Sequence, residues 1–361
     1  MSADWCVFNI GTGHASSEPD NILVRLHGSV AAGFINNGPG HKKGDLMGNV
    51  FGHGLGDRLE STMAGLPADA RRVFLVGHSR GAILSYLIAN EMKRKRSGID
   101  VHIFNIDPVA RYASGTDDKG VVQGNVRSVT ALVMENDNAP GIGVGNMFQL
   151  TFVRAVANPG LPIEYIPMPG THGTATQVNA RNPVGRAAYQ MALRWLDGHG
   201  VALTVQPEPA RTLCETFFEI HERNPVLGFT AAGGVAARAV TDWDKPSPEP
   251  KAQSSQNRAG MLAAAGISNP HSAGGGDKFT NAGLFINRYH SELFRACYPS
   301  SHPLATSSAT AMRGLRITPG ARDAIRSEVA VLKGYRCTWR TLTALGMADR
   351  LERAAAAPGP T

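Results

Sequence analysis

The chain is poor in cysteine and in aromatic residues and contains no long apolar run. Its cysteines lie far apart and form no Cys-x-x-Cys pair, so the sequence suggests neither a zinc site nor a small scaffold held by disulfides. No apolar run approaches the roughly 20 residues that span a bilayer. The N-terminal residues lack the basic segment of a Sec-type signal peptide. If the protein is exported, we therefore expect a route that needs no signal peptide.

The overall composition is that of a globular protein. With 42% apolar and 18% charged residues, the chain has the bulk character of neither a disordered nor a membrane protein. A net charge of +7 weakly favours an anionic surface such as phospholipid headgroups, although solubility explains it equally well. A length of 361 residues allows two domains. We expect a large domain at residues 1–203 and an accessory region at residues 204–361.

The most informative stretch is residues 71–90, RRVFLVGHSRGAILSYLIAN. Its apolar run at 73–76 predicts a central parallel strand that is buried on both faces, and the residues after the turn predict a helix. Between them, GHSRGA matches the nucleophile elbow G-x-S-x-G, in which Gly77 and Gly81 remove side chains that would clash at so abrupt a turn. Ser79 should therefore point outward at the positive end of the helix, where an acyl-transfer transition state develops negative charge.

A first strand is expected at residues 5–10, and the loop GTGHAS, 11–16, lies at its carboxyl end. Such loops form the ligand crevice of open α/β sheets. Because glycines let the backbone approach a ligand closely, the N–H groups of Gly11 and Thr12 can supply one oxyanion donor, and the N–H of Arg80 the other.

Three further segments precede the elbow strand. Residues 21–27 are apolar, and their pattern leaves open whether they form a strand or the start of a helix. The glycine-rich stretch 33–56 lacks periodicity and predicts a long loop, which is either solvated or in contact with substrate. Residues 57–66 predict a helix.

After the elbow helix, the sequence repeats a pattern of strand and loop in which polar residues follow the strands. The predicted strands and the residues after them are 101–106 with Asp107, 129–134 with Glu135 and Asp137, and 163–167 with His172. This order of serine, acid and histidine is that of the α/β hydrolases. The sequence thus predicts an α/β-hydrolase fold, with a mostly parallel sheet flanked by helices. In such a site His172 removes the proton of Ser79, and a carboxylate fixes the tautomer of the imidazole.

Two positions offer that carboxylate. Asp107 follows an apolar strand directly, and we expect Pro108 to hold its backbone extended at the end of the strand. Asp137 and Glu135 occupy the commoner acid position of the hydrolase fold, but they lie in a polar turn. We favour Asp107 and keep Asp137 as the alternative. His78, beside the serine, is expected to be a structural histidine.

The C-terminal part of the sequence changes character. An amphipathic helix at 186–197 closes the first domain, and another helix is possible within 211–228. Residues 231–277 are dense in Gly, Ala, Ser and Pro, as in a linker or long surface loop. Amphipathic helices at 285–298 and 319–332 could form a cap over the site, a partner-binding or lipid-facing module, or a plain packing face.

Five segments together carry a resemblance. FNIGTGHAS, GHSRGA, the strand end IDPVA, PGTHG and ALRWL look like the catalytic domain of the type VI secretion lipase effector (Tle) group of bacterial α/β hydrolases, over residues 5–200. This resemblance implies that Ser79 is the nucleophile, Asp107 the acid and His172 the base of a phospholipase A. His78 stands where that group has Phe, and Asp-Pro-Val replaces Asp-Thr-Val.

The resemblance also implies partners and a location. The expected partners are a phospholipid or other ester substrate, a membrane surface, and an immunity protein or a component of the secretion apparatus, with no nucleic acid. The protein would reside in the bacterial cytoplasm before export.

The sequence therefore predicts a serine ester hydrolase that works through an acyl-serine, with neither metal nor organic cofactor. A carboxylesterase or lipase acting on neutral esters is the first alternative. A catalytically inert interaction protein with a hydrolase fold is the second, and labelling by a fluorophosphonate distinguishes it from an enzyme.

Overall fold

The computed structural model describes residues 3–41, 54–110, 120–136, 151–152, 160–223, 319–344 and 348–356. The chain divides into two compact units, and the described residues of the first end at Pro207. Residues 208–223, 319–344 and 348–356 belong to the second unit.

The first unit is built on a six-stranded sheet with the order β2-β1-β3-β4-β6-β8, in which all neighbouring strands run parallel. The strands are β1 (Ala3–Asn9), β2 (Gly33–Asn36), β3 (Ala70–His78), β4 (Asp100–Ile106), β6 (Val126–Asn136) and β8 (Ile163–Thr171). The chain adds β2 on one side of β1 and all later strands on the other. The direction of strand addition thus reverses at β1, and such a switch point is where open α/β sheets bind ligands.

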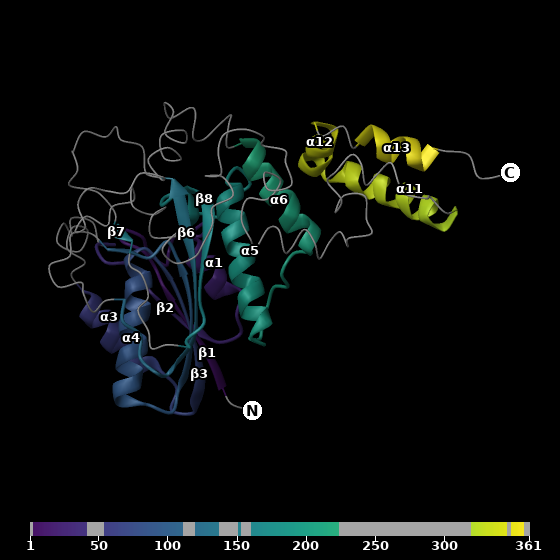
Figure 1. Ribbon diagram of the computed structural model, residues 1–361. Coiled ribbons are helices and arrows are strands. Elements are labelled where there is room, and N and C mark those ends of the chain that lie inside the picture. The colour runs from purple at the N-terminus through teal and green to yellow at the C-terminus, as the bar shows by residue number, and fades with distance from the viewer. Residues whose placement is uncertain are drawn as a thin grey trace, which may run out of the picture. The chain divides into compact units, whose positions relative to one another are not determined.

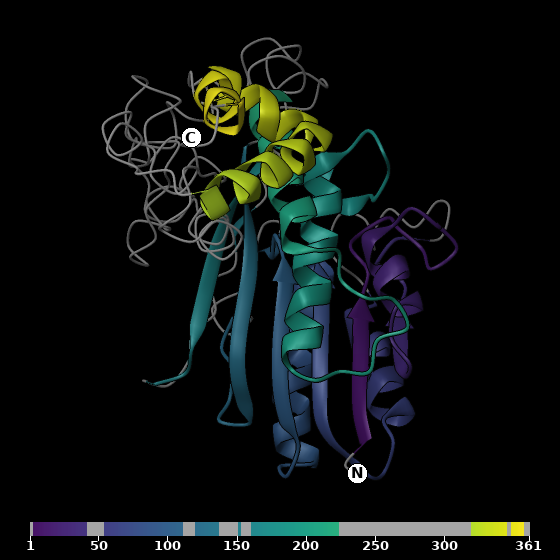
Figure 2. The ribbon, with the colours of Figure 1, turned by 90° about the vertical axis from the view of Figure 1, so that its right-hand side faces the viewer.

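Helices cover both faces of this sheet (Figure 1). Helices α3 (Leu55–Gly65) and α4 (Arg80–Lys95) lie on one face, and α1 (Ile22–Gly28) and α5 (Pro183–Gly198) lie on the other. Figure 2 shows α5 in front of the parallel strands. A short antiparallel pair, β5 (Val109–Ala110) with β7 (Thr151–Phe152), is separate from the main sheet. This architecture is the α/β-hydrolase fold that the sequence predicts.

The strand before the elbow is the centre of the core. Val73, Phe74, Leu75 and Val76 are completely buried, because α4 packs on one face of β3 and the opposite helices cover the other. A parallel strand covered on both faces needs apolar side chains in both directions, which explains the run without alternation. The predicted strand and the helix after it are confirmed, with bounds slightly wider than the sequence indicates.

The segments before the elbow contain one error of prediction. Residues 33–36 form β2, not a loop, since they pair in parallel with residues 6–9 of β1. The apolar stretch at 21–27, which the sequence left open, forms α1, and the side chain of Asn21 caps this helix by accepting a hydrogen bond from the N–H of Leu23 (3.0 Å). Residues 42–53 of the glycine-rich stretch lie outside the described residues.

The described part of the second unit is helical. It comprises α6 (Ala210–Arg223), α11 (Pro319–Gly334), α12 (Arg336–Ala344) and α13 (Ala348–Ala356). The carboxylate of Glu215 in α6 accepts hydrogen bonds from the backbone N–H groups of Cys337 (2.6 Å) and Thr338 (2.7 Å), and so caps the start of α12.

The predictions for the C-terminal region are met in part. The helix at 319–332 is confirmed and so is the first part of the helix within 211–228, whereas α12 and α13 were not predicted. The predicted loop at 231–277 and the helix at 285–298 lie outside the described residues. Within the described ranges, no helix combines the length and the apolar character needed to cross a bilayer.

Candidate active site

Ser79 occupies the sharp turn between β3 and α4. Its backbone has φ 57° and ψ −127°, a conformation that a residue with a side chain rarely adopts and that is typical of a nucleophile elbow. A Cβ atom on Gly81 would come within 1.9 Å of the carbonyl oxygen of Asn9, so only glycine lets α4 start this close to β1. The N–H of Ser79 donates a hydrogen bond to the carbonyl of Ile106 (3.1 Å), which ties the turn to the end of β4.

The structure brings Ser79, His172 and Asp107 into one chain of contacts. Nε2 of His172 lies 3.0 Å from Oγ of Ser79, and Nδ1 of His172 lies 2.7 Å from Oδ2 of Asp107. Because an ionised carboxylate only accepts hydrogen bonds, Nδ1 carries the proton of a neutral ring and Nε2 is the acceptor for the serine hydroxyl. The Asp107 side chain is fully buried and that of His172 is 14% exposed, which leaves the ring the more accessible of the two.

The backbone of Asp107 contradicts the expectation from Pro108. We expected an extended conformation, but Asp107 has φ 43°, in the left-handed region. The prediction was wrong because contacts with β6 outweigh the local preference for extended backbone that Pro108 imposes. The N–H of Asp107 donates to the carbonyl of Leu132 (2.7 Å), and its Oδ1 accepts from the N–H of Met134 (3.1 Å). The turn thus aims the carboxylate across β6 toward His172.

The alternative acid position lies at the end of β6. Glu135 lies within β6, which continues to Asn136 and pairs there with Thr171 of β8. Asp137 lies outside the described residues. Asp107 is therefore the carboxylate that the structure places on His172.

The three predicted oxyanion residues lie around Ser79. A Cβ atom on Gly11 would be 3.0 Å from Cβ of Ser79, so the backbone of the loop after β1 passes directly beside the serine. Nη1 of Arg80 donates a hydrogen bond to Oγ1 of Thr12 (3.1 Å), which links the elbow to that loop. The N–H of Arg80 belongs to the first turn of α4, where N–H groups have no acceptor within the helix. Their positive ends favour a negative charge at the serine.

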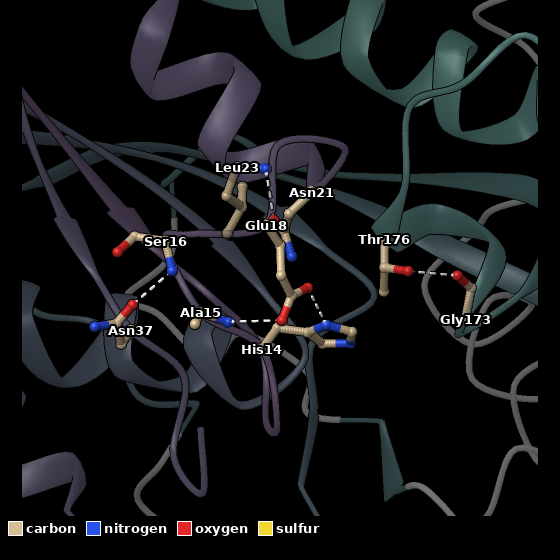
Figure 3. A network of polar contacts seen from close by, with 9 residues as sticks. All are labelled: His14, Ala15, Ser16, Glu18, Asn21, Leu23, Asn37, Gly173 and Thr176. Carbon is tan, nitrogen blue, oxygen red and sulfur yellow. Dashed lines mark hydrogen bonds and ion pairs between the residues drawn. The ribbon is translucent and has the colours of Figure 1, made fainter. Parts of the chain in front are cut away.

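Polar contacts that the sequence did not predict fix the shape of the loop after β1 (Figure 3). Glu18 accepts a hydrogen bond from the N–H of Ala15 (3.0 Å) with one oxygen and contacts Nδ1 of His14 (2.7 Å) with the other. The side chain of Asn37 accepts from the N–H of Ser16 (2.6 Å). These contacts hold residues 14–16 in place.

Arg58 of α3 also supports the loop after β1, through residues 37 and 38. Its guanidinium donates hydrogen bonds to the carbonyls of Asn37, of Gly38 (3.0 Å) and of Gly54 (2.6 Å). Gly38 in turn donates its N–H to the carbonyl of His14 (3.0 Å). The five donors of a guanidinium suit such multiple recognition. No local pattern in the sequence indicates this role, because Asn37 and Gly38 lie 21 and 20 residues before Arg58, and only Gly54 is near it in the chain.

The loop that carries His172 is tied to the segment before α1. The N–H of Val178 donates to the carbonyl of Asp20 (2.8 Å). Oγ1 of Thr176 donates to the carbonyl of Gly173 (2.7 Å), which closes the turn after the histidine (Figure 3). The bond between Val178 and Asp20 thus joins the loop that carries His172 directly to the segment before α1.

His78, which the sequence indicates to be a structural histidine, is buried beside the candidate base. Its imidazole stacks on that of His172, with ring centroids 4.7 Å apart and an angle of 28° between the planes. Burial lowers the pKa of His78 well below its usual range, and the positive charge of His172 lowers it further, while Asp107 acts in the opposite direction. His78 is therefore a neutral ring in direct contact with the candidate base.

Among the residues described, no group of three or more His, Cys, Asp and Glu side chains could hold a metal ion. The arrangement of the site suits nucleophilic chemistry. A serine hydroxyl, an imidazole oriented by a buried carboxylate, and backbone N–H groups at a helix start are the components of acyl transfer.

Comparison with known proteins gives only distant similarities. No protein-family model and no curated protein matches the chain. An uncharacterised protein from Pseudomonas aeruginosa is similar over 99% of this chain and 64% of its own, with 13% identity and a TM-score of 0.40. A Tle1 effector bound to the VgrG spike of a type 6 secretion system is similar over 49% of this chain and 51% of its own, with 12% identity and a TM-score of 0.31.

A third similar structure is RedJ, a thioesterase of prodiginine biosynthesis in Streptomyces coelicolor. It is similar over 55% of this chain and 89% of its own, with 17% identity and a TM-score of 0.31. The chain thus spans less than two thirds of the length of the first two structures, 64% and 51%.

Proposed function

We propose that the protein is a serine ester hydrolase that forms an acyl-serine intermediate. The observation that carries the proposal is the continuous contact from Ser79 Oγ to His172 Nε2 (3.0 Å) and from His172 Nδ1 to Asp107 Oδ2 (2.7 Å), on an elbow with the strained backbone of a nucleophile. A serine hydroxyl is a poor nucleophile at neutral pH, and this contact gives it a base.

In the first half of the reaction, Oγ of Ser79 attacks the ester carbonyl carbon while Nε2 of His172 takes the hydroxyl proton. The carbonyl oxygen becomes an oxyanion, which the N–H groups of Arg80 and of Gly11 or Thr12 stabilise. When the tetrahedral intermediate collapses, the C–O bond to the alcohol breaks, and the alcohol leaves with the proton that His172 returns. The acyl group remains on Ser79.

In the second half, water replaces the alcohol. His172 takes a proton from water as the water oxygen attacks the acyl carbon, and the second tetrahedral intermediate releases the carboxylic acid. Oγ of Ser79 recovers its proton from His172. Throughout, Asp107 holds the imidazole in the tautomer with its proton on Nδ1 and stabilises the charged ring that forms in each step.

We further propose that the ester is a glycerophospholipid, in a reaction of the phospholipase A type. Two sequence features support this substrate: the resemblance of the five catalytic segments to the lipase effectors, and the net charge of +7, which attracts an anionic lipid surface. The same resemblance supports a membrane surface, an immunity protein or a secretion component as partners, and a cytoplasmic location before export.

A substrate panel tests both levels of the proposal. The full chain is incubated with phosphatidylglycerol vesicles, triglyceride emulsion and a short-chain p-nitrophenyl ester, alongside Ser79→Ala and the control Ser61→Ala. Ser61 suits the control because it is an exposed serine of α3 whose hydroxyl bonds only the carbonyl of Asp57 among the described residues. Fatty acid release from vesicles that only Ser79→Ala loses supports a phospholipase.

The other outcomes of the panel are equally informative. Hydrolysis of the triglyceride or the short ester with intact phospholipid would replace the phospholipase by a lipase or carboxylesterase. No hydrolysis of any ester, with the fold intact, would favour an inert hydrolase-fold protein.

A further inference from the structure

We propose that His78 is a positioning residue, whose ring forms the third contact that fixes the plane of the base His172. This inference rests on the proposed function, since it concerns how the base is held for acyl transfer. It begins from the geometry of the two hydrogen bonds on the imidazole. These bonds anchor His172 at Nδ1 and at Nε2, yet they still permit the ring to rock about the line that joins its two partners.

A contact with the face of the ring removes this remaining freedom. The His78 imidazole supplies such a contact, at 4.7 Å between centroids and 28° between planes. Proton transfer between Ser79 and His172 depends on the alignment of Nε2 with the hydroxyl, and small misplacements of a catalytic group reduce rates steeply. The stack therefore maintains the alignment that the carboxylate sets.

The structure holds His78 itself rigidly. It is the last residue of β3 and pairs in register with Ile106 of β4. The loop after β1 packs on it, since a Cβ atom on Gly11 would lie 2.5 Å from Nδ1 and 3.2 Å from Cε1 of His78. Only 3% of the residue is exposed. Because β4 and the loop after β1 both hold His78, its ring can restrict the movement of the His172 ring.

The charge state of His78 suits this role. A second positive charge against His172 would oppose protonation of the base during the reaction, whereas a neutral aromatic face tolerates a cation. Burial and the nearby charges of His172 and His14 keep the pKa of His78 low, against the smaller opposing effect of Asp107. His78 should thus remain neutral while His172 gains and loses protons.

His78 also has a hydrogen bond with the backbone of His172, which both Phe and Leu would remove, so a comparison of these two substitutions isolates the contribution of the flat ring. Nε2 of His78 is buried and has no hydrogen-bond partner among the residues that the structure describes. A buried unpaired nitrogen costs stability that an apolar ring would avoid. His78→Phe therefore keeps a flat face against His172, and His78→Leu fills the space without one.

The test compares wild type, His78→Phe and His78→Leu with a matched control, His102→Leu. His102 is also a stacked histidine of the sheet, lying on Phe74 with 5.3 Å between centroids and 14° between planes, and its other contacts are with Ser128 and His199. The readouts are the rate of Ser79 modification by a fluorophosphonate, kcat and KM on a short ester, and the folded fraction from thermal melting.

We expect His78→Leu to lower kcat and the labelling rate about 10–100-fold with little change in KM, because only the alignment of the base is lost. His78→Phe should recover most of this loss and His102→Leu should label like wild type. Equal rates for His78→Leu and wild type, or an equally slow His78→Phe, would overturn the inference. A wild type that does not label at all would instead overturn the proposed function.

A measurement on the wild type covers the case in which His78→Leu does not fold. Histidine-labelled protein is followed by NMR across the pH range in which activity falls on acidification. A persistent proximity signal between the rings of His78 and His172, with His78 neutral throughout, supports the positioning role. Absence of the contact, or protonation of His78 in the same range, contradicts it.

Discussion

The backbone N–H of Met134 donates a hydrogen bond to Oδ1 of Asp107 (3.1 Å), while Oδ2 of the same carboxylate contacts Nδ1 of His172 (2.7 Å). The strand β6, which neighbours β4, thus fixes the Asp107 carboxylate and prevents free rotation of this side chain. This fully buried carboxylate is thereby held in place to orient the imidazole that it contacts.

Asp107→Asn should lower turnover by on the order of 10⁴-fold, because the amide can no longer enforce the tautomer with the proton on Nδ1 of His172. The amide oxygen can still accept from Met134, so the melting temperature should change little. Steady-state kinetics on one ester, beside thermal melting, measures both effects.

The matched control is Asp137→Asn at the alternative acid position, which should matter far less. A severe loss in Asp137→Asn beside a mild one in Asp107→Asn would move the acid from the end of β4 to that of β6. Comparing the two variants on one substrate avoids any dependence on which ester is used.

Arg58→Lys should reduce kcat about 10-fold, because a single ammonium group cannot hold the carbonyls of Asn37, Gly38 and Gly54 together. The loop at Gly38 supports the oxyanion residues through its hydrogen bond to His14. The measurement is kcat with melting temperature. Arg94→Gln, an exposed arginine paired with Glu91, is the control and should leave kcat unchanged. If Arg58→Lys had the same kcat as wild type, the hydrogen bonds of Arg58 to these three carbonyls would not support catalysis.

Acid should destabilise the first unit through His102. Burial, followed by the positive charges of His199 and Arg72, lowers the pKa of His102 from 6.5 to about 4. Between these values the unfolded chain binds more protons than the folded one, so stability is complete above pH 6.5 and is lost as the pH falls toward 4. Asp100 acts in the opposite direction and Arg127 in the same one.

Urea denaturation at a series of pH values measures this effect. His102→Gln, which cannot titrate, should flatten the dependence between pH 6.5 and 4. An unchanged slope in this variant would assign the acid sensitivity to other groups, of which His78 is the first candidate because its pKa is also lowered.

Glu215→Ala should destabilise the second unit by about 1–3 kcal/mol, since it leaves buried N–H groups at the start of α12 without their acceptor. Glu215→Gln keeps one oxygen and should cost less. Chemical denaturation monitored by the fluorescence of Trp339, with the other tryptophans replaced, reports on this unit. Glu352→Gln removes only a half-exposed ion pair with Lys333 and should be neutral. A Glu215→Ala variant as stable as wild type would refute the capping role.

Much of the fold could be predicted because its signals are local. The unbroken apolar run before Gly77 and the glycines of the elbow dictate a buried strand and a sharp turn. Since the carboxyl ends of parallel strands meet at one edge of the sheet, the order of Ser79, Asp107 and His172 along the chain predicts that they lie together. Their contacts in the structure agree with this prediction.

Other features depend on partners far along the chain and leave no local signal. The short strand β2 contains a glycine and is stabilised by its pairing with β1 and by the bond of Asn36 to Thr62 of α3, all partners outside the strand itself. The left-handed backbone of Asp107 is set by contacts with β6, and the capping of α12 by Glu215 joins residues 122 positions apart. The stack of His78 on His172 could not be predicted either, because the sequence does not show where the loop that carries His172 lies against the sheet.

The most direct test of the account is the site of covalent modification by a fluorophosphonate, determined by intact mass and peptide mapping. A reactive serine should give a single adduct on Ser79. The adduct should be absent from Ser79→Ala, present in Ser61→Ala, and slow to form in a His172→Ala variant that keeps its fold. A folded wild type without an adduct, or an adduct on another serine that persists in Ser79→Ala, would contradict the assignment of Ser79 as the nucleophile.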